Sequence, residues 1–107
     1  MSKNNFLGKW YILEMEMWDK DYIDAEVDGY ILFNTDGSGE FQFGYVHGFI
    51  NCKYTTKNNE GIVEFTWEGN DECNLANGRG YVKLKENNII GKIYIHNSDD
   101  SEFTAKR

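Results

Sequence analysis

Residues 39–56 constrain the fold more than any other part of the chain, because apolar side chains recur there at every second position. A period of two is that of a β-strand with one face turned to a core. The alternating residues are Phe41, Phe43, Tyr45 and His47, followed by Ile50, Cys52 and Tyr54. Between the two sets, His47-Gly48 supplies residues that tolerate positive φ angles. We predict a β-hairpin whose tight turn is His47-Gly48.

The same alternation of apolar and polar residues continues through most of the 107 residues and predicts an all-β protein. Seven Phe, seven Tyr and three Trp favour strands, while eleven Gly in short clusters favour turns. Eight predicted strands follow one another across these turns, and no predicted helix is long enough for a parallel crossover. We expect a single domain over residues 1–107, an eight-stranded antiparallel up-and-down barrel. A two-sheet β-sandwich is the alternative.

The first strand, which opens at residues 6–10 and runs to Met17 or Trp18, carries apolar residues on both of its faces. One face is uniformly apolar and is predicted to meet the core; its residues are Tyr11, Leu13, Met15 and Met17. The other face is Trp10, Ile12, Glu14, Glu16 and Trp18. If Trp10 points inward instead, either a β-bulge exchanges the two faces or Glu14 and Glu16 face the interior.

The net charge and the cysteine content restrict the classes of binding partner and the cellular compartment that we expect. The formal charge of −7 argues against nucleic acid, whose binding requires basic side chains, and favours a basic partner or a cation. No apolar run has the length of a signal peptide or a membrane span, so we expect no membrane association. Cys52 and Cys73 match no metal-binding spacing, and Cys52 is predicted to be a reduced, buried thiol. We expect a cytoplasmic protein.

Leu7-Gly8-Lys9-Trp10, at the start of the first strand, resembles the GxW motif of the calycins, the lipocalin, avidin and fatty-acid-binding barrels. In those proteins the Trp closes one end of the barrel and packs against a basic side chain from the last strand. The resemblance therefore implies that Lys106 or Arg107 packs on Trp10. The chain is shorter than a lipocalin and lacks a Thr-Asp-Tyr turn of that family's kind.

Much of the chain also resembles a group of small, uncharacterised bacterial proteins. The segments that carry this resemblance are residues 14–19, 36–44, 67–72, 78–80 and 99–101. The resemblance implies a compact bacterial domain and no particular activity.

The leading functional hypothesis is a module that binds a small ligand at the open end of the barrel. Two predicted loops, residues 19–27 and 69–79, would rim that end, the first with one helical turn around residues 22–25. Aromatic walls with a few polar groups are typical of such pockets. The candidate ligand-binding residues are Glu14, Glu16, Trp18, Tyr45, Trp67, Tyr94 and Arg79. A barrel filled entirely by side chains would exclude this pocket.

Two other classes of function remain open. One is a metal- or carboxylate-dependent enzyme that uses Glu14, Glu16 and a histidine. Glu14 and Glu16 lie two apart on one strand, and inside a barrel they would suit an acid/base pair or a cation site, although exposed strands often carry such residues. With a carboxylate, the two histidines could bind zinc or another divalent metal; the candidate ligands are His47, His96 and Asp71. The other class is protein interaction, as a homo-oligomer or with a basic protein. No cofactor-binding motif is present, so no cofactor is expected.

Overall fold

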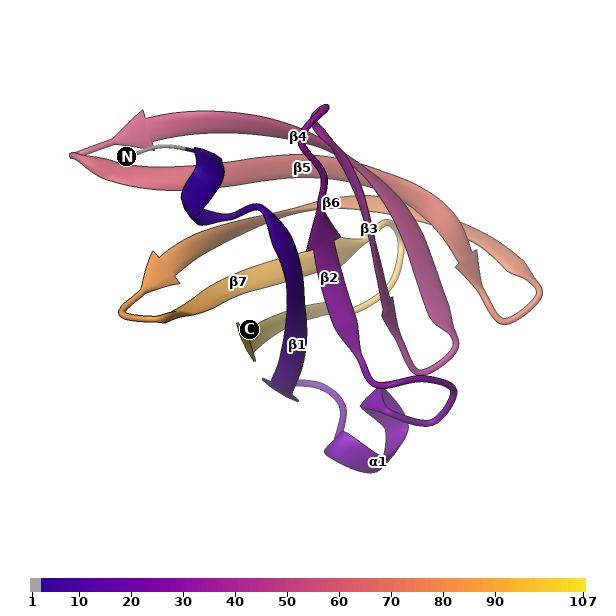
Figure 1. The fold of residues 1–107 in the computed structure, drawn as a ribbon. Helices are drawn as coiled ribbons and strands as arrows, with labels where there is room; N and C mark the ends of the chain where they lie inside the picture. Colours follow the sequence, from indigo (N-terminus) through magenta and orange to yellow (C-terminus); the bar gives the residue numbers. More distant parts are fainter. Residues whose placement is uncertain (1–2) are drawn as a thin grey trace.

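The computed structural model describes residues 3–107, which form a closed antiparallel barrel of eight strands in chain order (Figure 1). Residues 1 and 2, part of the predicted domain, lie outside the described residues. The elements are the 3-10 helix η1 (Lys3–Asn5), β1 (Gly8–Met15), α1 (Lys20–Ile23), β2 (Tyr30–Phe33), β3 (Ser38–Phe43), β4 (Val46–Lys57), β5 (Glu60–Asp71), β6 (Asn74–Lys85), β7 (Asn88–Ile95) and β8 (Asp100–Lys106). Because β1 pairs with β8, the sheet closes. The predicted barrel is confirmed and the sandwich is excluded.

The inward face of β1 differs from the prediction. Trp10 and Ile12 are buried, whereas Tyr11 and Leu13 are 40% and 36% exposed. The pairing of β1 with β8 shifts between Ile12 and Glu14, so a β-bulge at Leu13 exchanges the two faces and returns Met15 to the interior. The bulge alternative is therefore confirmed. Glu14 and Glu16 are both exposed, and the idea that they face the interior is wrong.

The central hairpin also turns earlier than predicted. β3 and β4 are joined by Gly44-Tyr45, and Phe43 pairs directly with Val46. Gly44 has a φ of +56°, whereas Tyr45 is not among the positive-φ residues, which is the arrangement of a type II′ hairpin turn. Gly48 lies within β4, where an added Cβ would come within 2.7 Å of both the Phe41 and the Trp67 rings. Gly48 is thus needed for packing, and the predicted turn at His47-Gly48 is wrong.

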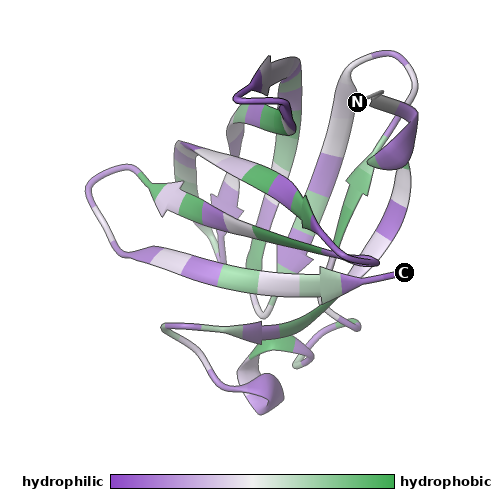
Figure 2. Ribbon diagram, turned by 90° about the vertical axis from the view of Figure 1, so that its left-hand side faces the viewer, coloured by the Kyte–Doolittle hydropathy of each residue, from purple (hydrophilic) through white to green (hydrophobic). Residues whose placement is uncertain are grey.

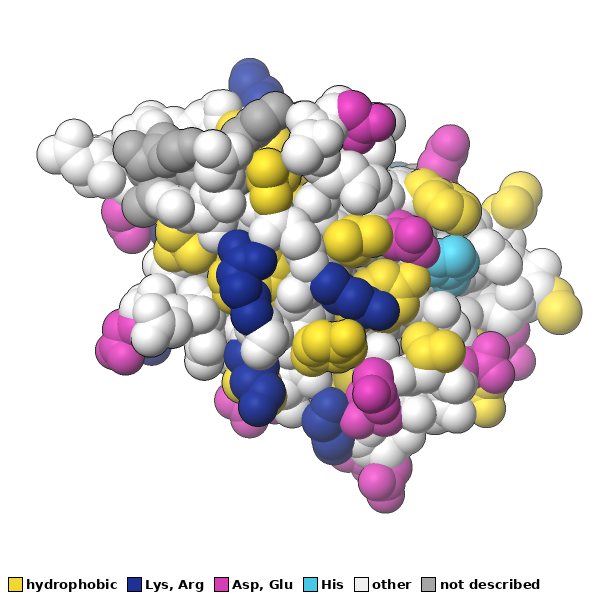
Figure 3. Space-filling view, viewed as in Figure 1, with side chains coloured by type: hydrophobic (Ala, Val, Ile, Leu, Met, Phe, Trp, Pro, Cys, Tyr) yellow, Lys and Arg dark blue, Asp and Glu magenta, His cyan; other side chains and the backbone are white. Residues whose placement is uncertain are grey.

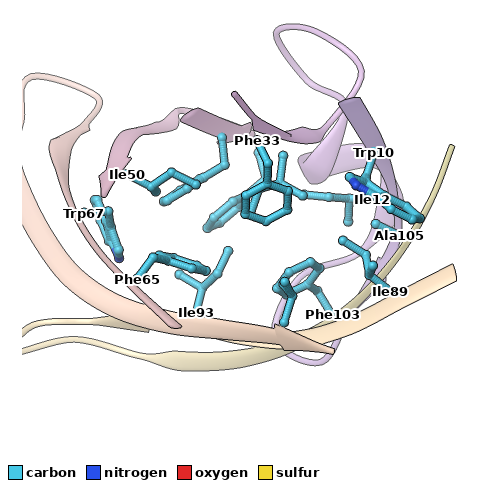
Figure 4. Packing of buried hydrophobic residues seen from close by; sticks show 14 of the residues in the cluster. Trp10, Ile12, Phe33, Ile50, Phe65, Trp67, Ile89, Ile93, Phe103 and Ala105 are labelled. Carbon is cyan, nitrogen blue, oxygen red and sulfur yellow. The ribbon is translucent and has the colours of Figure 1, made fainter. Parts of the chain in front are cut away.

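Inward-facing side chains from all eight strands fill the interior of the barrel (Figure 4). Hydrophobic and hydrophilic residues alternate along the strands, as Figure 2 shows, which is the pattern of a sheet with one face in a core. The largest fully buried side chains include Trp10, Phe33, Phe41 and Phe43. An eight-stranded barrel has an interior just wide enough for side chains to fill.

One end of the barrel is closed by Trp10 and the end of the chain. The Trp10 indole donates a hydrogen bond to the Phe6 carbonyl, and the Arg107 guanidinium lies 4.1 Å from the centre of the Trp10 ring. Arg107 also donates to the carbonyls of Leu7 and Asn5 at 2.6 and 2.8 Å. The predicted contact between Trp10 and a basic side chain is therefore present, and Arg107 supplies it.

The other end is covered by the connection that contains α1 (Figure 1). Ile23 of α1 is fully buried, and its carbonyl accepts a hydrogen bond from Gly44 N at 2.8 Å. Tyr22 lies beside Trp18, whose ring centre is 4.9 Å from that of Phe43. The Asp19 side chain caps α1 by accepting from Tyr22 N. This connection, the α1 cap (residues 16–29), covers the end that was expected to be open.

The predicted loop at residues 69–79 is mostly strand. β5 continues to Asp71 and β6 begins at Asn74, so only Glu72-Cys73 form the turn. The β4–β5 and β5–β6 hairpins extend beyond the other strands at opposite ends of the molecule (Figure 1). Within residues 3–107, no helix has the length and apolar character needed to cross a membrane.

Candidate functional site

The outer face of β1–β5 presents two adjacent rows of side chains that run across the strands. The strand register defines both rows. The first contains Lys9, Leu32, Glu40, Phe49 and Glu68, and the second contains Tyr11, Tyr30, Gln42, His47 and Asn70. Figure 3 shows hydrophobic side chains gathered on this side of the molecule, with lysine or arginine, carboxylate and histidine side chains among them.

Glu40 is the centre of the polar contacts on this face. Its Oε2 atom accepts a hydrogen bond from the Tyr30 hydroxyl at 2.7 Å and lies 3.0 Å from Nε2 of His47. These contacts join β2, β3 and β4 because Glu40 reaches diagonally to the neighbouring row. No described residue contacts the other carboxylate oxygen, Oε1, by a hydrogen bond. Glu40 is thus held in place and still has an acceptor available.

The contacts shift the acidity of two of these groups. Hydrogen bonds from His47 and then Tyr30 hold the pKa of Glu40 below its ordinary value. Burial, followed by the hydrogen bond to Glu40, raises the pKa of Tyr30 to about 12. At neutral pH, Tyr30 is therefore a protonated donor and Glu40 an ionised acceptor.

A groove of about 420 Å³ lies over the β1–β3 part of this face; we call it the outer groove. Its residues are Lys9, Tyr11, Val27, Asp28, Tyr30, Leu32, Glu40 and Gln42. The Lys9 ammonium lies between two of its aromatic rings, 4.4 Å from the centre of Tyr30 and 5.4 Å from that of Tyr11. The groove therefore combines aromatic surface with carboxylate, amide and ammonium groups.

Glu14 and Glu16 lie in a second groove, on the outside of β1 and β6–β8. It has a volume of about 440 Å³ and includes Tyr81, Lys83 and Glu102. Glu16 Oε1 accepts a hydrogen bond from Glu102 N at 3.3 Å, so Glu16 stabilises the start of β8. Among the described residues that line this groove there is no histidine.

The remaining ligand candidates are distributed over three separate places. Trp67 is in the core, where its indole donates to the Tyr94 carbonyl at 3.1 Å. The Tyr94 ring lies outside, 4.1 Å from the Arg79 guanidinium. Trp18 and Tyr45 contact Tyr22 in and beside the α1 cap. The structure therefore does not bring the four predicted aromatic residues together at the barrel end.

The three candidate metal ligands are also apart. His47 pairs with Asn70 on the outer face, whereas Asp71 is opposite Val46, at the next position of the ladder. His96 follows β7 and lies in a third groove, of about 490 Å³, with Arg79 and Tyr94. The part of the chain described, residues 3–107, contains no group of three or more His, Cys, Asp or Glu side chains suited to a metal ion.

Sequence reasoning selected His47 but missed Lys9, Tyr30, Glu40 and Gln42. The alternation around Phe41 and Phe43 already shows that Glu40 and Gln42 face outward. Their proximity to Tyr30 and His47 depends on the register of three strand pairs, which a single sequence does not provide. A turn placed at Gly44-Tyr45 would have indicated that His47 is directly opposite Gln42.

Comparison with known proteins adds no family: no family model, no curated protein and no solved structure matches this chain.

Proposed function

We propose that this protein is a non-catalytic binding module that takes a small ligand in the outer groove. The observation that carries the proposal is the Tyr30–Glu40–His47 set of contacts, which holds polar groups in fixed positions beside half-buried aromatic and aliphatic side chains. Small-molecule sites are concavities in which oriented polar groups lie beside apolar and aromatic surface, and about 420 Å³ is within their usual range.

The rest of the barrel supports an external site. Large side chains occupy the interior, Trp10 and Arg107 close one end, and the α1 cap covers the other. A ligand at the barrel end would have to displace Ile23, which is fully buried. The binding hypothesis drawn from the sequence is kept, and its site moves from the barrel end to the outer face.

The chemistry of the groove favours binding over catalysis. With its pKa at about 12, the Tyr30 phenol is poorly matched to proton transfer at neutral pH. The two carboxylates proposed for an enzyme, Glu14 and Glu16, lie in a groove that includes neither His47 nor His96. We also infer a cytoplasmic location, which the two free cysteines favour.

The contact between Trp10 and Arg107 supports the proposed calycin relationship.

A ligand-observed NMR screen with a library of small fragments tests this proposal. The screen is run on the wild type and on Tyr30→Phe, which removes only the hydroxyl that contacts Glu40. Tyr81→Phe is the matched control, because Tyr81 lies on the outside of β6 in another groove. We expect fragments whose binding weakens at least about threefold in Tyr30→Phe alone. Equal binding to all three proteins would contradict the proposal.

Protein interaction is a second candidate, favoured by apolar side chains on the surface. Phe49 is 56% exposed on the outer face, and Leu75 is 95% exposed on β6 near the tip of the β5–β6 hairpin. Sedimentation at several concentrations tests self-association directly. A protein that remains monomeric up to about 1 mM would argue against the homo-oligomer.

A further inference from the structure

We propose that the ligand of the outer groove is a neutral carbohydrate, a short oligosaccharide that lies across β1–β3. This inference rests on the proposed function and names its ligand class. It comes from the aromatic surface, the type of polar groups and the charges that surround them.

The aromatic surface suits a sugar ring. Tyr11 and Tyr30 are directly opposite each other in the register of β1 and β2, and both face outward. Tyr11 is 40% exposed, so its ring has surface available for a ligand. A pyranose ring has faces of C–H bonds that pack against an aromatic ring, and Tyr supplies this surface with little loss of conformational freedom.

The polar groups match the edges of a sugar. Asp28, Glu40 and Gln42 each end in a planar carboxylate or amide that can hydrogen-bond a sugar hydroxyl, and the Gln42 amide nitrogen also donates to the Gly44 carbonyl at 3.4 Å. Glu40 is already positioned by Tyr30 and His47 through Oε2, while Oε1 has no hydrogen-bond partner among the described residues. Lys9 adds a donor beside the rings.

The charges in the groove disfavour an anion, and Lys9 takes the place over the aromatic rings where a cationic ligand would bind. Lys9 already occupies the cation position over the Tyr30 and Tyr11 rings, so a cationic ligand would meet a like charge there. Asp28 and Glu40 repel an anion, as does the net charge of −7. A neutral, hydrogen-bonding ligand avoids both penalties.

The size of the groove fits more than one sugar ring. Three adjacent strands span about 10 Å in the hydrogen-bonding direction. Two linked pyranose rings cover a similar distance. Because the groove is open to solvent on the outer face, the outward hydroxyls of such a ligand would stay hydrated.

The test is an amide NMR titration with three neutral trisaccharides: cellotriose, maltotriose and N,N′,N″-triacetylchitotriose. Spermidine and citrate serve as cationic and anionic probes at the same concentrations. We expect at least one trisaccharide to shift the amide signals of Lys9, Tyr11, Tyr30 and Gln42. We also expect its Kd to rise at least about fivefold in Tyr11→Ala and to be unchanged in the control Tyr81→Ala, since both variants lose an outward Tyr from the barrel.

The outcomes separate the ligand class from the proposed function. If no trisaccharide shifts these amides, or if Tyr81→Ala weakens binding as much as Tyr11→Ala does, the carbohydrate assignment is overturned. It is also overturned if spermidine or citrate binds the groove more tightly than every trisaccharide. If fragments still bind in a way that depends on Tyr30, the proposed binding module is retained without the carbohydrate assignment. If neither the fragments nor the trisaccharides bind the outer groove, both proposals are contradicted.

Discussion

Gly48 shows how one residue decides the geometry of the core. It lies near the start of β4 and faces the interior, where the rings of Phe41 and Trp67 meet edge to face at 5.0 Å between centroids. A side chain at this position would occupy the space where these rings lie. Gly therefore serves packing here, although strand interiors usually disfavour it.

We predict that Gly48→Ala lowers the free energy of unfolding by about 1–3 kcal/mol, because the Cβ would lie 2.7 Å from two buried aromatic rings. Urea denaturation followed by Trp fluorescence measures the change. Asn51→Ala, an exposed position on the same strand, is the control and should change stability by less than about 0.5 kcal/mol. If Gly48→Ala left the free energy of unfolding unchanged, the Phe41 and Trp67 rings would have to be able to move apart.

Glu40 gives a prediction about pH. Its pKa is lower in the folded protein, so its contacts stabilise the fold above the ordinary pKa of a glutamate, 4.5, and this contribution is lost as the pH falls through the folded pKa. Since Glu40 and His47 are each about one-third exposed, we expect Glu40→Gln to lose only about 0.5–1 kcal/mol at pH 7. The loss should be smaller at pH 3 than at pH 7, because protonation of Glu40 removes its charged contacts.

Urea midpoints measured at pH 7 and pH 3 check this expectation. Glu68→Gln is the matched control, because Glu68 belongs to the same outer row and is exposed. A loss of stability that is the same at both pH values would mean that the charge of Glu40 contributes nothing.

At the scale of elements, β1 and the α1 cap determine what the barrel can bind. Two features of β1 were visible in the sequence: apolar residues on both faces, and Trp10 in the GxW motif. The bulge at Leu13 reconciles them, because it lets Trp10, Ile12 and Met15 all face the interior. Period-two alternation alone placed Met15 correctly but also placed Tyr11 and Leu13 in the interior, since it assumes an uninterrupted strand.

We predict that the α1 cap depends on Ile23. Ile23→Ala should lower the free energy of unfolding by about 2–4 kcal/mol, because a fully buried Ile leaves a cavity when it is truncated. Hydrogen exchange should also become faster at Gly44, whose N–H donates to the Ile23 carbonyl. Glu26→Ala, an exposed change in the same connection, is the control. Unchanged exchange at Gly44 in Ile23→Ala would show that the cap is held by other contacts.

For the whole molecule, the barrel could be predicted from the sequence and the site could not. The number of alternating segments, the short turns and the lack of a crossover helix were enough to indicate eight antiparallel strands. The outer groove requires residues from β1, β2 and β3 to be adjacent across two strand pairs. Each one-residue error in register would move Glu40 or Tyr30 to the other face, and a single sequence does not determine that register.

Closure of the barrel gives a prediction with a natural control. Arg107→Ala removes the contact with Trp10 and two hydrogen bonds to backbone carbonyls, and should cost about 1–2 kcal/mol of stability because the guanidinium is partly in solvent. Lys106→Ala, at the exposed neighbouring position, should have little effect. Thermal denaturation of the two variants compares them. Equal effects would mean that Arg107 does not help to close the barrel.

The most direct test of an external site in a filled barrel is the location of bound fragments, measured by amide and methyl NMR on the same sample. We predict that binding shifts the amides of Lys9, Tyr30 and Gln42 and leaves the methyl signals of the buried residues Ile31, Val63 and Ile93 unchanged. Shifts of these interior methyls, with the outer groove unaffected, would place the ligand inside the barrel and contradict the account.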